Sequence, residues 1–179
     1  KSGSPEKVPG SSSGTIRSKF ETNPKYRMTP DKMRAAIERA TSRWQPLITE
    51  ACQKYGITKF IPFVKAIIYQ ESGGKPDAVG KNRNGTYDRG LMQLNSAYFK
   101  HPNIMDPEVN IDLGVKNIAR LVQRFKGNLI DVAASYNCGH PEGLPSKSQP
   151  GGRWGIPNLT KYTYVPNVIY MMKAQGVTD

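Results

Sequence analysis

Apolar residues recur along most of this chain at the three- and four-residue steps that mark amphipathic helices. The clearest stripe falls within residues 110–125, and its members share one helical face: Ile111, Val115, Ile118, Val122 and Phe125. Weaker patterns predict helices at about 59–71, 129–137 and 161–174, and a kinked helical unit over 29–55. The fold is therefore expected to be dominated by helices.

A small β element is expected between the second and third helical units. Residues 77–88 contain Asn84-Gly85, a dipeptide typical of tight turns, and the short flanks predict a small hairpin or an ordered loop. A short helix is expected next, at about 91–99. The predicted fold class is α+β and helix-dominated, with room for a cleft between the helices and the hairpin.

Two segments of the chain lack hydrophobic periodicity. Residues 1–28 are rich in Ser, Gly, Pro and Lys, which predicts a flexible basic arm ahead of a folded domain at 29–179. Residues 139–159 are punctuated by Pro and Gly, and a loop this long in a compact domain is often functional. Trp154 within this loop could stack on a sugar or simply anchor the loop.

Charge limits the classes of partner. The chain of 179 residues has a formal net charge of +12, so its surface attracts polyanions such as nucleic acid, an anionic membrane or an acidic wall polymer. No recognised nucleic-acid motif supports the first of these, and no stretch is long and apolar enough to span a bilayer. Lys1 in place of Met indicates a mature or excised fragment, which leaves export open.

Cysteine and histidine are scarce. Cys52 and Cys138 allow one disulfide at most, and both are expected to be small core residues. With only two histidines and no paired zinc-ligand spacing, a metal site is not expected.

A single acid ends the most apolar of the predicted helices. Glu71 follows the run FVKAIIYQ and precedes Ser72, Gly73 and Gly74, and the glycines supply the positive-φ positions that stop a helix. The negative end of the helix dipole and an apolar wall would both favour the protonated carboxyl. A carboxylic acid kept neutral near working pH is suited to proton donation. The alternative is a helix-end glutamate exposed to water.

Three blocks around this acid resemble a known family. QESGGKP at 70–76, YDRGLMQLN at 87–95 and ASYNCG at 134–139 resemble, in content, order and separation, the soluble lytic transglycosylase family of lysozyme-like domains. The linking stretch at 106–114 also matches, and the resemblance covers roughly residues 45–175. Within the family, the blocks look most like the specialised enzymes that accompany secretion and conjugation machines, followed by phage virion enzymes.

The resemblance implies a lysozyme-like fold whose hairpin lies beside a substrate groove, and a lyase that acts on peptidoglycan glycan strands. Glu71 would protonate the glycosidic oxygen between N-acetylmuramic acid and N-acetylglucosamine, then take the proton of the muramyl C6 hydroxyl as that oxygen attacks C1. The product would carry a 1,6-anhydromuramyl end, with no water consumed and no cofactor. The location implied is extracytoplasmic or virion-associated, with anionic wall polymers and a secretion, conjugation or virion assembly as candidate partners.

The resemblance also implies substrate-binding residues near the acid and in the second block. Ser72 is expected to position Glu71, whereas Met92 and Gln93 are expected to line the sugar subsites. Gln93 could instead make a helix-cap contact, and the neighbouring Leu91 and Leu94 are expected to be plain core residues.

Aromatic residues complete the implied site. Tyr136 and Asn137 match a pair opposite the acid, where Asn137 would donate to acetamido or hydroxyl groups, although Tyr136 could also only pack. Tyr164 matches an aromatic hydroxyl near the catalytic carboxyl, and Tyr162 and Tyr170 are nearby rivals for that role.

Asp88 decides between two reactions. A hydrolytic muramidase would use Asp88 as a second carboxylate to activate water or stabilise C1, with Glu71 as its acid. The structural alternative is an aspartate that caps its loop through nearby amides. A further alternative is a non-catalytic cell-wall-binding module that kept the groove. Cys138 stands where the family usually has a smaller, inert residue, and is expected to be tolerated there.

Overall fold

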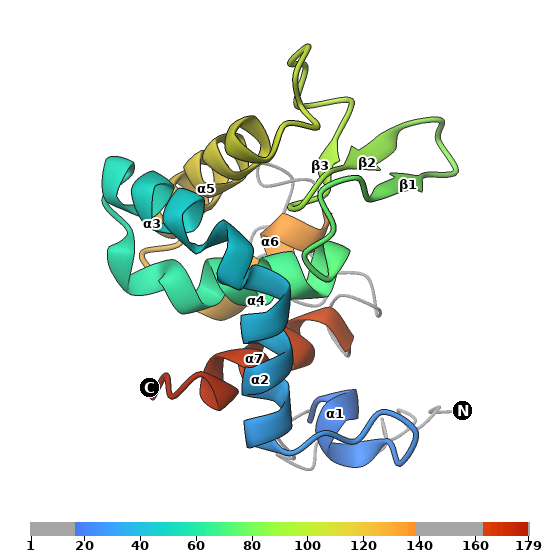
Figure 1. Cartoon of the computed structure of the whole chain (residues 1–179), viewed down its shortest axis with the longest axis vertical. Coiled ribbons are helices and arrows are strands. Elements are labelled where there is room, and N and C mark those ends of the chain that lie inside the picture. The colour runs from blue at the N-terminus through green and yellow to red at the C-terminus, as the bar shows by residue number, and fades with distance from the viewer. Residues whose placement is uncertain (1–16, 139–162, 179) are drawn as a thin grey trace, which may run out of the picture.

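The computed structural model describes residues 17–138 and 163–178. Helices form most of this part of the chain: α1 (Lys19–Thr22), α2 (Pro30–Thr41), α3 (Gln45–Lys54), α4 (Ile61–Ser72), α5 (Pro107–Arg124), α6 (Leu129–Cys138) and α7 (Val165–Ala174). The 3-10 turns η1 (Ser42–Trp44) and η2 (Thr58–Phe60) precede α3 and α4. The strands β1 (Val79–Lys81), β2 (Tyr87–Arg89) and β3 (Leu94–Asn95) form one antiparallel sheet in that order (Figure 1). The predicted helix-dominated α+β class is confirmed.

Helix α4 runs through the hydrophobic core. Its apolar side chains are fully buried at Phe63, Val64, Ala66, Ile67 and Ile68. Helices α2, α3 and α7 pack against it, which explains why its sequence is apolar on nearly every face (Figure 1). The helix predicted at about 59–71 is thereby confirmed, with its first residues in η2 rather than in α4.

Two glycines end α4 and fix where Glu71 lies. Gly73 adopts a left-handed conformation with φ of 62°, so the helix ends at Ser72, one residue after the acid. Gly74 has φ of 82°, and a Cβ there would lie 1.9 Å from the carbonyl oxygen of Ala40. The chain therefore turns tightly against α2 at this point and holds Glu71 in the last turn of α4.

The hairpin is confirmed, but the short helix expected at 91–99 is wrong. Strands β1 and β2 pair with Gly80 opposite Asp88, and the next residues form turns and the short strand β3. Gly90 and Gln93 have φ of 78° and 49°, and a right-handed helix cannot pass through such positions. The Asn110 side chain stabilises this irregular segment by accepting a hydrogen bond of 2.8 Å from the Met92 backbone nitrogen.

Residues just after position 17 pack against helix α7. Ser18 caps α1 and donates a hydrogen bond of 2.7 Å to Asn167 on α7, and the buried ring of Phe20 stacks on Tyr170 with centroids 6.2 Å apart. The Tyr170 hydroxyl in turn donates to the Met28 carbonyl. The folded part of the chain thus starts ahead of the expected boundary at residue 29, and residues 1–16 lie outside the described residues.

No disulfide joins Cys52 and Cys138. Cys52 is buried in the core, as expected, and burial raises the pKa of its thiol to about 11. Cys138 is partly exposed at the end of α6. Among the described helices, none is both long enough and apolar enough to cross a bilayer.

Candidate active site

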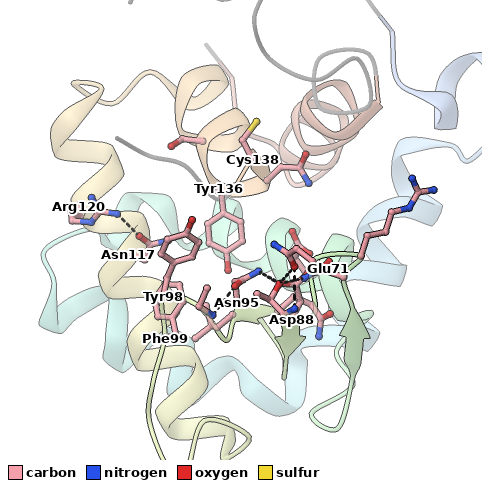
Figure 2. Close-up of a pocket in the computed structure, with 18 residues that line it drawn as sticks. Glu71, Asp88, Asn95, Tyr98, Phe99, Asn117, Arg120, Tyr136 and Cys138 are labelled. Atoms are coloured by element: carbon pink, nitrogen blue, oxygen red, sulfur yellow. Dashed lines mark hydrogen bonds between the residues drawn. The ribbon is translucent and has the colours of Figure 1, made fainter. Parts of the chain in front are cut away.

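A groove of about 1030 Å³ opens between the end of α4, the sheet, α5 and α6 (Figure 2). Glu71 enters it from α4, Asp88 from β2, and Tyr136 from α6. Side-chain amides and aromatic rings make up much of the rest of its lining. The predicted cleft between the helices and the hairpin is therefore present, and Glu71 lies in its wall.

Glu71 has an environment that favours its protonated form. Burial raises its pKa to about 7, the charge of Asp88 adds to this rise, and a hydrogen bond from Tyr164 partly opposes it. The rise was expected from the apolar wall of α4. At neutral pH both the protonated and the ionised carboxyl are therefore present in substantial amounts.

Tyr164 lies directly before α7, and its hydroxyl donates a hydrogen bond of 2.7 Å to Oε1 of Glu71. Burial and the neighbouring Glu71 charge raise the pKa of this phenol well above its ordinary value, so it stays a neutral donor. Its rival Tyr170 bonds to Met28 instead, and Tyr162 lies outside the described residues.

Ser72 and Met92 support the groove from behind. The Ser72 hydroxyl donates a hydrogen bond of 2.7 Å to the Leu91 carbonyl, which joins the end of α4 to the irregular segment. The Met92 side chain is fully buried and packs over Gly114 on α5. Neither residue is among the described lining residues, so Met92 does not line the groove as expected, and the role of Ser72 in positioning Glu71 stays a prediction. Left-handed residues flank the Leu91-Met92 pair, with Gly90 before it and Gln93 after it.

Gln93, Tyr136 and Asn137 all line the groove, as expected. The Gln93 amide also has a structural task, because its Nε2 donates to the carbonyls of Ala78 (3.0 Å) and Gly90 (2.9 Å). The Tyr136 hydroxyl donates to the Met92 carbonyl at 2.6 Å, and burial raises its pKa well above the ordinary value. Leu91 and Leu94 are buried core residues, as predicted.

Asp88 makes the local capping contact that its position suggested and also lines the groove. Its Oδ1 accepts a hydrogen bond of 3.1 Å from the Asn95 amide, which is the local capping contact. Its carboxyl also lines the groove with Glu71 and raises the pKa of that residue (Figure 2). The site thus contains two carboxyls that influence each other through space.

Several groove residues were not found from the sequence, namely Asn95, Tyr98, Phe99, Asn117 and Arg120. Asn95 lies inside the second sequence block, and Tyr98 is an aromatic side chain with 59% of its surface exposed. Asn117 and Arg120 lie on the polar side of the clearest amphipathic helix, where the sequence offers no sign that this side faces a groove. The long loop with Trp154 lies outside the described residues.

Within the ranges 17–138 and 163–178, no group of three or more His, Cys, Asp or Glu side chains is placed to hold a metal ion.

The family model described as the transglycosylase SLT domain matches residues 46–152. The chain belongs to this family. The match includes all of α4, both carboxyls of the groove and Tyr136, whereas Tyr164 lies beyond its end.

Two kinds of relative resemble this SLT domain. Invasion protein IagB from Salmonella typhimurium (strains SL1344 and LT2) and from Salmonella typhi is 34% identical over 83 residues, which is 41% of this chain and 51% of the relative. The chain thus spans about half the length of the curated relatives it matches. An X-ray structure of an inactive mutant of the lytic transglycosylase Slt from Pseudomonas aeruginosa matches with a TM-score of 0.52 and 20% identity, covering 82% of this chain and 30% of that one. This match confirms the predicted fold.

Proposed function

We propose that this SLT domain is a peptidoglycan lytic transglycosylase in which Glu71 acts first as an acid and then as a base. The observation that carries the proposal is the pKa of Glu71, about 7, on a carboxyl in the wall of a groove lined by amides and aromatic rings. Such a lining suits a glycan, since amides bond to hydroxyl and acetamido groups and rings stack on sugars. Membership of the family supports the substrate class.

The pKa allows one residue to perform both proton transfers. Protonated Glu71 gives its proton to the glycosidic oxygen as the bond from that oxygen to the muramyl C1 breaks. The resulting carboxylate takes the proton of the C6 hydroxyl as O6 bonds to C1, which closes the 1,6-anhydro ring. Glu71 ends protonated again, and no water enters the products.

Tyr164 is a positioning residue in this scheme. It holds Oε1 of Glu71 at 2.7 Å and leaves Oε2 for proton transfer to and from the sugar. Because its phenol pKa is raised well above the ordinary value, Tyr164 does not compete as an acid.

Asp88 supports a second candidate, a hydrolytic muramidase. A carboxylate that lies in the groove close enough to raise the pKa of Glu71 could stabilise positive charge at C1 or activate a water. In the lyase, the same charge stabilises the oxocarbenium-like transition state while O6 replaces water as the nucleophile.

Digestion of purified sacculi tests these proposals, with product masses as the measurement. Anhydromuramyl ends, lighter by one water than reducing ends, support the lyase, whereas reducing muramyl ends support the muramidase. Glu71→Gln is expected to release neither product while still binding sacculi. If the wild-type protein releases nothing and binds as well as Glu71→Gln, the domain is a non-catalytic wall-binding module.

We also propose that the enzyme works outside the cytoplasm or in a virion, where it opens the wall for a secretion, conjugation or virion assembly. The net charge of +12 would hold it to an anionic wall, so binding to sacculi should weaken as salt rises. Binding to sacculi that does not change with salt concentration would contradict this electrostatic attraction. Cell fractionation with an antibody to the domain tests the location.

A further inference from the structure

One part of the groove carries a positive charge that the acid–base chemistry does not use. Arg120 and Asn117 lie on α5 and line the same groove as Glu71. Figure 2 shows them beside Tyr98, on the side of the groove away from Glu71 and Asp88. Nη2 of Arg120 donates a hydrogen bond of 3.0 Å to Oδ1 of Asn117, which holds the two side chains together at the groove wall.

This pair has the donor chemistry of a carboxylate site. A guanidinium presents several N–H donors in one plane and can bond to both oxygens of a carboxylate. Asn117 uses its amide oxygen to accept from Arg120, so its amide nitrogen is oriented as an additional donor. A neutral sugar hydroxyl has no need of a full positive charge, whereas a carboxylate does.

The position of Arg120 differs from that of its neighbours on α5. Lys116 and Arg124 lie one turn before and one turn after it, and both are exposed to solvent, as Arg120 is. Neither is among the described residues that line the groove. Of these three cations, Arg120 is therefore the one that places its charge at the groove wall, and the other two contribute to the general positive field.

The groove contains charges of both signs. Glu71 and Asp88 repel an anionic group of a bound strand, whereas two arginines of the lining attract it: Arg83, between β1 and β2, and Arg120, on the side away from the two acids (Figure 2). Arg120 is held at the groove wall by its hydrogen bond to Asn117. The scissile sugars themselves carry no charge, and the stem peptides attached to muramyl residues end in free carboxylates.

We propose that Arg120 and Asn117 bind a carboxylate of the stem peptide carried by the glycan strand. The inference rests on the proposed function for its substrate class. Because Arg120 lies away from Glu71, it recognises a substituent of the strand and takes no part in proton transfer. The enzyme would accordingly prefer strands whose stem carboxylates are free over strands in which they are amidated.

Co-sedimentation with sacculi tests the inference, using a Glu71→Gln background so that nothing is cleaved. The sacculi are freed of other polymers and used either native or with their carboxylates converted to methylamides. Arg120→Gln is expected to weaken binding to native sacculi roughly three- to tenfold and to leave binding to methylamidated sacculi unchanged. Arg124→Gln is the matched control, and should change the two affinities by less than about twofold.

Equal losses for Arg120→Gln and Arg124→Gln would overturn the inference, as would a loss for Arg120→Gln that persists on methylamidated sacculi. Cleavage assays in the wild-type background separate this outcome from failure of the proposed function. There Arg120→Gln should raise KM on native strands with kcat unchanged. A wild-type protein that releases no muropeptides refutes the proposed activity, while the binding experiment still decides whether Arg120 recognises carboxylates.

Discussion

The hydroxyl of Tyr164 donates a hydrogen bond of 2.7 Å to Oε1 of Glu71, joining residues 93 positions apart in the sequence. The bond connects the start of α7 to the end of α4, two helices that also pack against each other in the core. It stabilises the carboxylate form of Glu71, in opposition to burial and to the charge of Asp88. The pKa of about 7 is the balance of these three effects.

Tyr164→Phe should move the pH profile of the enzyme toward higher pH. The hydrogen bond lowers the pKa of Glu71, so its removal raises that pKa above about 7. Since the first step needs the protonated acid, the alkaline limb of kcat/KM against pH should shift upward by as much as about one unit. Loss of orientation should also reduce kcat by about tenfold.

Tyr170→Phe is the matched control for this prediction. Tyr170 lies on α7, and its hydroxyl donates a hydrogen bond to the Met28 carbonyl instead of to Glu71. Its loss should lower the free energy of unfolding by about 1 kcal/mol and leave the alkaline limb in place. If both variants shift the limb equally, the hydrogen bond of Tyr164 does not tune Glu71.

Glu71→Gln should make the folded domain more stable at alkaline pH. The folded pKa of about 7 lies above the ordinary value of 4.5, so the folded state binds more protons than the unfolded state between these values. The wild-type protein therefore loses stability as pH rises from about 4.5 to 7, and keeps that loss above 7. The amide of Gln does not ionise, so its burial brings no such loss of stability, and its oxygen can still accept the hydrogen bond from the Tyr164 hydroxyl.

The expected gain is as much as about 3 kcal/mol in the free energy of unfolding at pH 8, and close to zero at pH 4.5. Urea denaturation at the two pH values measures it. Glu50→Gln, at an exposed position on α3, should show little difference between them. If the difference in the free energy of unfolding between Glu71→Gln and wild type is the same at both pH values, burial does not destabilise the ionised acid.

The sequence was sufficient where local patterns determine the structure. The apolar run of α4 and the glycines after it placed Glu71 at a helix end, and Asn84-Gly85 located the hairpin turn. These features depend on residues within one or two turns of each other. The family resemblance then pointed to Gln93 as a groove residue and to Tyr164 as a hydroxyl near the acid.

Prediction from the sequence failed where contacts between distant residues determine which way a side chain points. Met92 was expected to face the substrate, yet the left-handed conformation of Gln93 and a bond from Met92 to Asn110, 18 residues away, turn it into the core. Arg120 became a groove residue only through the packing of α5 against α6. Neither relationship leaves a periodic signal.

Phe20→Ala should destabilise the domain although it lies in the stretch expected to be a flexible arm. The Phe20 ring is 8% exposed and stacks on Tyr170, so its removal exposes apolar surface and leaves a cavity against α7. The free energy of unfolding should fall by about 2–4 kcal/mol, measured by urea denaturation. Tyr26→Ala, at a position 42% exposed, should cost less than about 1 kcal/mol. Similar small losses for both would show that residues 17–28 do not belong to the folded domain.

Asn110→Asp should be among the most damaging single changes outside the groove. The Asn110 side chain is fully buried, and its Nδ2 donates to the carbonyls of Arg89 and Ile104 at 2.9 Å each. Its Oδ1 accepts from the Met92 backbone nitrogen, so all of these bonds hold the segment that forms one wall of the groove. A carboxylate would lose both donors and face two carbonyl oxygens in a dry environment.

The free energy of unfolding should fall by about 3–5 kcal/mol at pH 7. The loss should be smaller at pH 4, because protonation removes the buried charge and restores one donor. Gln123→Glu makes the same amide-to-carboxyl exchange at an exposed position of α5 and should change stability by less than about 0.5 kcal/mol. Urea denaturation of the two variants at both pH values measures the difference. A loss for Asn110→Asp that does not depend on pH would show that steric misfit, and not buried charge, destabilises the groove wall.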